Sequence, residues 1–317
     1  MRVVVVGAGL AGLVAARELA AAGASVRVVD KGRSPGGRLA TRRIAGATLD
    51  HGAQFFTVRT SEFRARVDDW LDRGRARVWA KGFGDDDGHP RYVATDGMSS
   101  LGKDLATGLT VECSTMAFAV RPAPAGQDGD ARWSVEIDDG TARPADAVVV
   151  TCPLPQSFAL LVEAGVDLDE RLFRVDYDKT LALLLALDRA PAVPPPGGLQ
   201  RPDATFSFVG DNAAKGVSPR PAATFHASPE WSDAHWDDDP ADALAQLIRA
   251  ADQWLGDAQV VEAQVKRWRF ATPRTIWPDP CWVTGDGSLV VAGDAFAGPR
   301  VEGAHNSGLA AATALLP

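Results

Sequence analysis

The chain opens with an order of apolar and polar stretches that is typical of a βαβ unit. Residues 3–6 are four valines, as in a short strand buried inside a parallel sheet. A helical stretch follows to about residue 22, and a second apolar strand is predicted at residues 25–29. Near the other end, an apolar strand at residues 288–292 precedes a helix of small residues over 303–315.

The middle of the chain predicts a second domain with its own core. Outside the first unit, the apolar pattern indicates strands at residues 181–187, 205–209, 222–226 and 260–269, and an amphipathic helix at 241–254. Earlier, a helix-like stretch at 61–71 and a strand-like stretch at 75–80 interrupt the first unit, a short helix begins near residue 97, and a strand at 148–151 returns to it.

Glycines follow the first strand at the positions where a dinucleotide needs them. Gly7, Gly9 and Gly12 form a GxGxxG pattern, and Asp30 ends the second strand. Gly7 permits a tight turn, Gly9 lets a pyrophosphate approach the backbone, and Gly12 lets the helix pack close to the strand. The helix N-terminus offers N–H donors to phosphates, and Asp30 can accept hydrogen bonds from ribose hydroxyls. The pattern predicts a dinucleotide site, which by itself fits FAD or NAD(P).

The segment after the second strand favours FAD. Gly36, Gly37 and Arg38 form a triplet that resembles an element of the FAD-dependent amine-oxidase and glutathione-reductase-like superfamily. In that superfamily the glycines let the chain pass close to the cofactor, and the arginine lies near its phosphates and ribityl chain. The resemblance implies FAD, bound without a covalent link.

Two further clusters are predicted to lie at a flavin. Residues 50–57 read DHGAQFFT, where Gly52 would let the backbone reach the ring and Gln54 could hydrogen-bond near it; a strand end with a turn is the alternative. In the segment 293–304, Asp294 could hold ribityl hydroxyls or cap the next helix. The N-terminus of that helix would favour the anionic reduced flavin.

Together these motifs resemble the bacterial renalase-like branch of the flavin amine-oxidase superfamily, which has the p-hydroxybenzoate-hydroxylase fold. The resemblance rests on DHGAQFFT, on residues 228–231 and 268–271, and on GDAFAGPRVEGAHNSG at 293–308, and it extends over nearly the whole chain. Besides Gly7, Gly9, Gly12 and Asp30, the residues expected to contact FAD are Leu10, Ala11, Lys31, Gly37, Arg38, His51, Gly52, Ala53, Gln54, Phe55, Asp294, Val301, Glu302 and Ala304.

The same resemblance implies the fold class. It is α/β, or α+β overall, with a Rossmann-like FAD-binding domain of three-layer ββα architecture and an inserted substrate domain with a mixed or antiparallel sheet. We place the discontinuous FAD-binding domain at residues 1–56, 97–167 and 279–317, and the substrate domain at 57–96 and 168–278.

The resemblance also implies a reaction. The 2-dihydro and 6-dihydro isomers of NAD(P)H would lose a hydride to flavin N5 and give NAD(P)+, while O2 is reduced to H2O2. Hydride loss restores the aromatic ring, so no general base is needed, unlike amine oxidation. A flavin amine oxidase or another FAD oxidoreductase with a small donor is the alternative, and a non-catalytic FAD-binding protein is a third. With Tyr92 and Tyr177 as the only tyrosines, no aromatic pair of the kind that forms an amine cage can be identified.

Six residues are candidates for the substrate site. Those for catalysis are Gln54, Tyr177, His226 and Asn306, and those for the pocket walls are Phe56 and Trp268. Each has an ordinary structural alternative: Tyr177 at a strand end, Trp268 in a core, and His226 as a buried histidine with satisfied hydrogen bonds.

Composition and charge narrow the range of partners. The 317 residues are 46% hydrophobic and 23% charged, as in ordinary globular proteins, and 33 Lys+Arg against 41 Asp+Glu give −8. This balance argues against nucleic acid and anionic membranes as partners. Cys113, Cys152 and Cys281 lie far apart without metal-ligand spacing, which favours a reducing compartment and no metal. The uncharged stretch at 3–16 is too short to cross a bilayer. We therefore expect a cytoplasmic protein whose partners are a small-molecule substrate and O2.

Overall fold

The computed structural model describes residues 1–83, 88–124, 126, 131–296 and 298–316. The chain divides into two compact units, each assembled from separate stretches. Unit 1 is made of Met1–Gly37, Leu101–Asp176 and Pro273–Pro317, and unit 2 of Arg38–Ser100 and Tyr177–Thr272. No helix in the described part of the chain is long and apolar enough to cross a bilayer.

Unit 1 contains a sheet in the order β17-β18-β11-β1-β2-β7. Its strands are β1 (Arg2–Val6), β2 (Ser25–Asp30), β7 (Thr110–Cys113), β11 (Ala147–Val150), β17 (Trp282–Val283) and β18 (Leu289–Val291). All neighbouring pairs are parallel except β17 with β18. The four valines of β1 are at most 4% exposed, as expected for a parallel strand covered on both faces.

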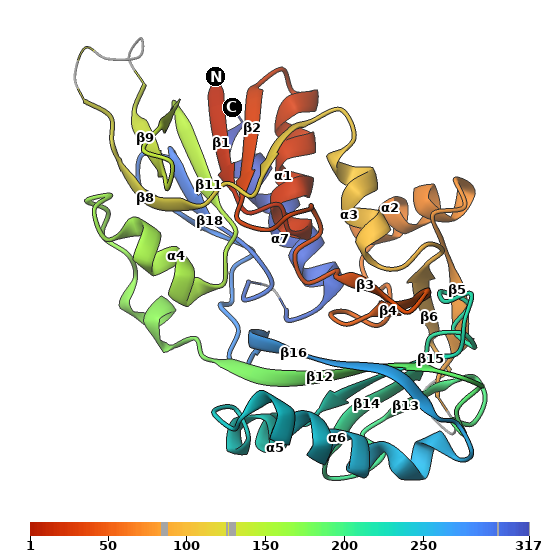
Figure 1. Cartoon of the computed structure of the whole chain (residues 1–317). Helices are drawn as coiled ribbons and strands as arrows, with labels where there is room; N and C mark the ends of the chain where they lie inside the picture. The colour runs from red at the N-terminus through yellow and green to blue at the C-terminus, as the bar shows by residue number, and fades with distance from the viewer. Residues whose placement is uncertain (84–87, 125, 127–130, 297, 317) are drawn as a thin grey trace. The chain divides into compact units, whose positions relative to one another are not determined.

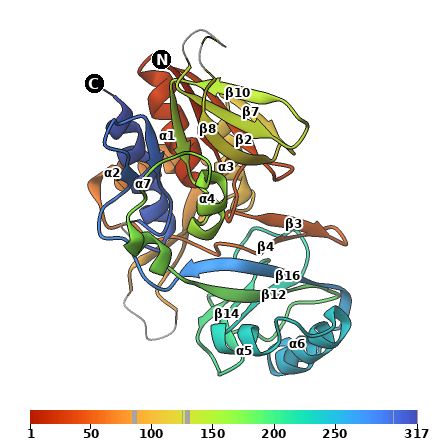
Figure 2. The same ribbon diagram turned by 90° about the vertical axis from the view of Figure 1, so that its left-hand side faces the viewer.

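Two layers cover this sheet. On one side, α1 (Leu10–Ala21) packs on β1 and β2, with α7 (Val301–Leu315) beside it (Figure 1; Figure 2). A small antiparallel sheet in the order β10-β9-β8 contacts β1 through β10. The remaining elements of unit 1 are β8 (Ala117–Pro122), β9 (Trp133–Ile137), β10 (Ala142–Ala145), α3 (Ser99–Ala106, with its first two residues in unit 2), α4 (Leu154–Leu161) and the 3-10 helix η1 (Glu170–Arg174). The predicted three-layer ββα architecture is confirmed.

Unit 2 contains a sheet in the order β13-β14-β15-β12-β16. Its strands are β12 (Tyr177–Leu187), β13 (Gly198–Gln200), β14 (Phe206–Asp211), β15 (Ala222–Ala227) and β16 (Val260–Pro273). β12, β15, β14 and β13 pair antiparallel in succession, which confirms the predicted type of sheet.

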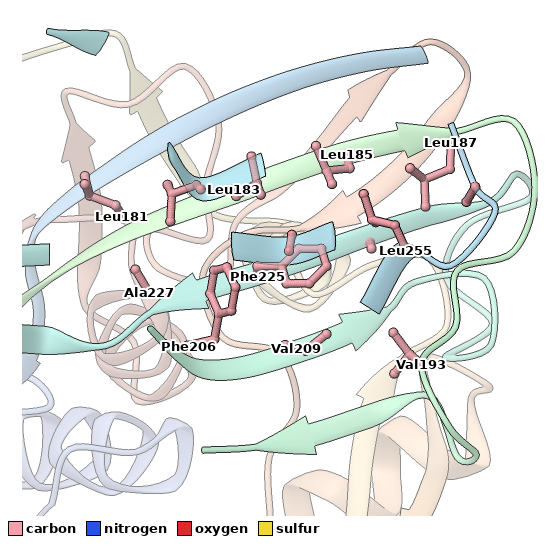
Figure 3. Packing of buried hydrophobic residues seen from close by; sticks show 14 residues of the cluster. Leu181, Leu183, Leu185, Leu187, Val193, Phe206, Val209, Phe225, Ala227 and Leu255 are labelled. Atoms are coloured by element: carbon pink, nitrogen blue, oxygen red, sulfur yellow. The ribbon is translucent and has the colours of Figure 1, made fainter. Parts of the chain in front are cut away.

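The alternation of side chains along β12 and β15 places one face of this sheet on a helical layer. Leu181, Leu183 and Leu185 of β12 lie in one buried cluster with Phe225 of β15 (Figure 3). The amphipathic helix α6 (Pro240–Leu255) contributes its buried side chains to this cluster, and α5 (Pro229–Ala234) lies on the same side of the sheet (Figure 1).

The opposite face of the sheet packs on a hairpin. Leu184 and Ala186 of β12 lie in one buried cluster with Leu49, which belongs to the hairpin of β3 (Thr41–Ile44) and β4 (Ala47–Asp50). Successive side chains of a strand point to opposite faces. Thr224 and His226 therefore lie on the hairpin side of β15. Unit 2 also contains α2 (Ser61–Asp72) and the hairpin of β5 (Ala76–Lys81) and β6 (Pro90–Ala94).

The compact units have bounds that differ from the predicted domains, most clearly at residues 38–56. These residues were placed in the FAD-binding domain at 1–56, but they belong to unit 2 because their hairpin packs on β12. The sequence pattern did not predict this hairpin, the small sheet β8–β10 or α4. As a division by function, the predicted domains stay a prediction.

Candidate functional site

The loop after β1 has the form of a phosphate cradle. Gly7 has φ +111°, and a Cβ at Gly12 would lie 1.9 Å from the Gly7 carbonyl oxygen, so glycine is required at both positions. Thr151 donates its hydroxyl to the carbonyl oxygens of Val6 and Gly7 and fixes the turn. No side chain caps α1 at Gly9, which leaves the N-terminal turn of the helix to bind an anion.

Asp30 ties the end of β2 to this loop. One carboxylate oxygen accepts the Ala8 N–H at 2.6 Å, and the other accepts the Gly32 N–H at 2.6 Å. Each oxygen keeps a further lone pair, so the carboxylate can also accept from a ribose hydroxyl. Lys31, predicted beside it, is exposed.

The two glycines of the GGR triplet lie directly on the loop. The Gly36 N–H donates to the Ala8 carbonyl oxygen at 2.8 Å, and Gly36 forms a parallel bridge with Gly9. A Cβ at Gly37 would lie 3.0 Å from the Gly9 Cα. This narrow, side-chain-free strip of unit 1 fits the adenosine and pyrophosphate part of a dinucleotide.

The C-terminal motif places a second helix start in unit 1. A Cβ at Gly303 would lie 2.0 Å from the Gly298 carbonyl oxygen, and the Gly293 N–H donates to Ser307 Oγ at 2.8 Å. Arg300 is the N-cap residue of α7, so the alternative in which Asp294 caps this helix is wrong. The N-terminal turn has no side-chain cap and contains Val301, Glu302 and Ala304, with Asn306 in the next turn bonded to His305 Nδ1 at 3.0 Å.

In unit 2, Arg38 and the DHGAQ segment are tied together through the backbone. The Arg38 guanidinium donates to the carbonyl oxygens of Phe270 and Ala271 of β16. The Ala53 N–H donates to the Arg38 carbonyl oxygen at 2.9 Å, and a Cβ at Gly52 would lie 2.0 Å from that oxygen. Gly52 is therefore required by a close approach of two backbones.

Asp50, at the end of β4, is the centre of a buried polar network. One carboxylate oxygen accepts Thr41 Oγ1 at 2.6 Å and the Met98 N–H at 2.8 Å, and the other accepts Lys215 Nζ at 2.8 Å. The side chains of Asp50 and Lys215 are both 0% exposed. Burial lowers the pKa of Lys215, and the Asp50 carboxylate opposes this effect. The Asp50 carbonyl oxygen also accepts the Thr224 hydroxyl at 2.9 Å.

Gln54 and His226 form the polar surface next to this network. Gln54 Nε2 donates to the carbonyl oxygens of Asp50 at 2.7 Å and Gly52 at 3.2 Å, and lies 3.3 Å from His226 Nε2. Trp268 Nε1 donates to the His51 carbonyl oxygen at 2.7 Å, and its ring stacks on the His51 ring at 5.3 Å. Four predicted residues, Gln54, His51, His226 and Trp268, are thus brought together.

Both histidines of this surface are uncharged near neutral pH. Burial lowers the pKa of His51 to about 4, with smaller contributions from Lys266 and Arg42. Burial also lowers the pKa of His226 to about 4, and the charge of Lys215 acts in the same direction.

Phe55 and Phe56 point into two different groups of aromatic rings. Phe55 lies with Trp79, Phe83 and Phe208, at centroid distances of 6.4, 5.3 and 6.0 Å. Phe208 is also 6.1 Å from the His226 ring, so this group borders the polar surface. Phe56 is 3% exposed and stacks on Tyr92 at 5.7 Å, within the core around α2. Its role as a pocket residue stays a prediction.

The other predicted residues are divided between the units. Tyr177, at the start of β12, is 5% exposed and meets the edge of Phe270 at 5.6 Å. The predicted residues of unit 1 are Gly7, Gly9, Leu10, Ala11, Gly12, Asp30, Lys31, Gly37, Asp294, Val301, Glu302, Ala304 and Asn306, and those of unit 2 are Arg38, His51, Gly52, Ala53, Gln54, Phe55, Phe56, Tyr177, His226 and Trp268. Among the described residues, no three His, Cys, Asp or Glu side chains gather as a metal site would require.

Asp50 and Lys215 are the site residues that sequence reasoning missed. Asp50 belongs to the DHGAQ motif, whose pattern assigns no role to its carboxylate. Lys215 stands in the run AAKG, four residues after Asp211, and nothing in this stretch distinguishes it from an ordinary surface lysine.

The sequence matches two family models that together span almost the whole chain. One is described as an NAD(P)-binding Rossmann-like domain and matches residues 5–73. The other is described as flavin containing amine oxidoreductase and matches residues 74–316.

Two curated relatives match over short stretches. The chain is 52% identical over 58 residues to hydroxyneurosporene desaturase of Rubrivivax gelatinosus, and 46% identical over 67 residues to putrescine oxidase of Kocuria rosea. These stretches are 18% and 21% of this chain, but only 11% and 14% of the length of those proteins.

Solved structures match over the full length. A candidate protoporphyrinogen oxidase from Exiguobacterium sp. 255-15 superposes with a TM-score of 0.74 at 14% identity, over 98% of both chains. Wild-type putrescine oxidase bound to putrescine gives a TM-score of 0.71 at 14% identity, over 99% of this chain and 98% of that one. At this identity they show the fold alone, and the fold agrees with the prediction.

The glycine cradle, the uncapped start of α1 and the Asp30 carboxylate fit the nucleotide part of FAD, and the flavin family model covers the greater part of the chain. The chain belongs to the family of flavin containing amine oxidoreductases, and its cofactor is FAD, held without a covalent bond.

Proposed function

We propose that the protein is an FAD-dependent oxidase of the renalase-like kind, which oxidises the 2-dihydro and 6-dihydro isomers of NAD(P)H to NAD(P)+ and reduces O2 to H2O2. The observation that carries this proposal is the polar surface of unit 2. Gln54, His51 and His226 are uncharged, and each makes hydrogen bonds within the protein or lies against a neighbouring ring.

Such a surface suits a substrate that needs no base. A bound FAD would supply the hydride acceptor and the route by which the electrons reach O2. The ring that loses the hydride becomes a pyridinium cation, so the protein need only hold a flat, neutral ring and avoid opposing the new positive charge. Phe55 is partly exposed and offers its ring for stacking, and the partly exposed His226 offers an uncharged polar group, with the buried Phe208 and Gln54 packed beside them.

An amine oxidase of the same family is the second candidate. It is favoured by the 46% identity to putrescine oxidase over 67 residues. An amine must lose its proton before oxidation. The imidazoles of His51 and His226, with pKa values of about 4, are weak acceptors for that proton.

The test is to mix the oxidised protein without O2 with each dihydronicotinamide isomer in turn. We expect the visible flavin absorbance to bleach rapidly with the 2- or 6-dihydro isomers, not with ordinary 4-dihydro NAD(P)H, and H2O2 to form when air is admitted. Bleaching by none of the isomers, but by putrescine or another amine, would replace this proposal with amine oxidation. A flavin that no donor reduces would point to a protein that binds FAD without turnover.

A pair of variants links the activity to the polar surface. Replacing Gln54 by leucine removes the amide that contacts His226, and we expect flavin reduction to slow by at least about tenfold. The matched control is Gln264→Leu, since Gln264 lies on β16 and its side-chain amide donates to the exposed side chain of Glu262. Equal rates of flavin reduction in the two variants would show that the reaction does not depend on this surface.

A further inference from the structure

The Asp50–Lys215 ion pair is buried beside the proposed substrate site. Lys215 Nζ donates to Asp50 Oδ2 at 2.8 Å and to Gln54 Oε1 at 3.4 Å, and it faces the Trp79 ring at 5.7 Å. The desolvation cost of a buried ion pair can exceed the Coulombic attraction between its charges, so the pair is weak evidence of a purely stabilising role. The side chain that the pair holds in place is Gln54.

The neighbours of Gln54 permit one orientation of its amide. An ammonium group only donates, so Lys215 must face Oε1. The carbonyl oxygens of Asp50 and Gly52 only accept, so they must face Nε2. Turning the amide over would bring donor against donor and acceptor against acceptor at every one of these contacts.

This orientation determines the state of the His226 ring. Gln54 Nε2 carries two hydrogens and cannot accept, so a proton on His226 Nε2, 3.3 Å away, would face a donor. That ring nitrogen is therefore the unprotonated one, and it shares one of the two amide hydrogens with a carbonyl oxygen. The ring proton is then on Nδ1. The His226 ring also has a hydrogen bond with the backbone of His51, which acts to raise its pKa and therefore favours a proton on the ring.

We propose that Lys215 is a positioning residue: through its ion pair with Asp50 and its hydrogen bond to Gln54, it holds His226 uncharged, with the proton on Nδ1 and Nε2 toward Gln54. The groups that face His226 are Gln54, His51 and Lys215. Arg77 is a further charged group near Lys215, and its guanidinium donates to the Lys215 carbonyl oxygen.

This role rests on the proposed function only for its consequence in catalysis. Hydride loss from a neutral dihydropyridine leaves a positive charge on the ring, which a protonated His226 would oppose. With Lys215 in place, the imidazole stays uncharged into mildly acidic solution, and substrate oxidation continues there. Without Lys215, protonation of His226 should begin at higher pH and slow the reaction.

The test uses the holoenzyme labelled with 15N-histidine, with the His226 signals assigned by their loss in His226→Gln. In the wild type we expect the Nδ1–H tautomer, without protonation at pH 5.5 and above. In Lys215→Met we expect protonation to begin roughly one pH unit higher, the size of effect that a nearby unit charge produces. The acidic limb of the rate of flavin reduction should move by the same amount.

Controls separate this role from simple loss of structure. Lys179→Met removes another lysine of unit 2, paired with Asp233 at 3.0 Å near the surface, and should change neither the tautomer nor the pH profile. If Lys215→Met does not fold, the double variant Asp50→Asn/Lys215→Met leaves no unpaired charge and should shift the protonation of His226 in the same direction. A wild-type ring protonated on Nε2, or an unchanged protonation of His226 in whichever of the two variants folds, would overturn the proposal.

The two readouts fail independently. The NMR titration needs no substrate and tests the role of Lys215 alone. If it gives the expected result while no dihydronicotinamide bleaches the flavin, the proposed substrate is wrong and the role of Lys215 stands.

Discussion

Replacing His226 with glutamine should make the protein less sensitive to acid. The pKa of His226 is lowered from 6.5 to about 4 in the folded protein. Between these values the unfolded chain binds a proton that the folded protein does not, so stability falls as the pH falls through this window. The full loss, reached below pH 4, is about 3 kcal/mol, and at pH 5 it is already about 2 kcal/mol.

Glutamine is the suitable replacement because its amide both donates and accepts but does not titrate. It can keep a contact with Gln54 and with the His51 backbone. We expect the wild type to lose about 2 kcal/mol more than His226→Gln between pH 7.5 and pH 5. The carboxylates and His51 titrate in both proteins and cancel in the difference.

The assay is urea unfolding of the two holoproteins at pH 7.5 and pH 5, followed by tryptophan fluorescence with excess FAD present. Linear extrapolation gives the free energy of unfolding in each case. If the wild type and His226→Gln lose the same free energy of unfolding between pH 7.5 and pH 5, within about 0.5 kcal/mol, the reasoning is refuted. His226 would then have the same pKa in the folded and the unfolded protein.

Three further substitutions test other parts of the structure. In Gly12→Val the new Cβ would lie 1.9 Å from a backbone oxygen, so FAD should bind at least about tenfold more weakly in a titration of the apoprotein. The control is Gly285→Ala, where a Cβ has no atom within 4 Å, and this variant should bind FAD with the wild-type affinity. Equal affinities of the two variants would contradict this account. Phe225→Ala should lower the free energy of unfolding by about 3–5 kcal/mol, since the ring is fully buried. The control Val261→Ala, at a site 61% exposed, should change the free energy of unfolding by less than about 0.5 kcal/mol. Similar losses in the two variants would argue that the cluster around Phe225 is not a stabilising core. Trp268→Phe keeps a ring on His51 but removes the bond to its carbonyl oxygen, so urea unfolding should show a loss of about 1 kcal/mol, and no loss would mean that water replaces the bond.

The nucleotide loop could be predicted because its requirements are local. Gly7, Gly12 and Asp30 lie within 24 residues of each other, and each meets a geometric need of one βαβ unit. The strands at β12 and β15 were predicted for a similar reason, since apolar runs bounded by turns indicate strands whatever their partners are.

The buried ion pair could not be predicted because its two residues are 165 positions apart. Neither carries a periodic or spacing signal, and a lone lysine is normally at the surface. The hairpin β3–β4 was missed because its strands have four residues each and two arginines, and its burial depends on the leucines of β12. The pairing of distant segments, rather than local preference, determines both features.

The interleaving of the two units along the chain has a consequence for folding during synthesis. Unit 2 is complete in sequence at residue 272, while α1 of unit 1 still lacks α7, the helix that packs on it. At a synthesis rate of about 5–20 residues per second, α1 emerges on the order of 15 to 60 s before α7. During that time the apolar flank of α1 is uncovered and open to chaperones. Neither unit corresponds to a continuous fragment, so a nicked chain should hold together through its packing rather than release a domain.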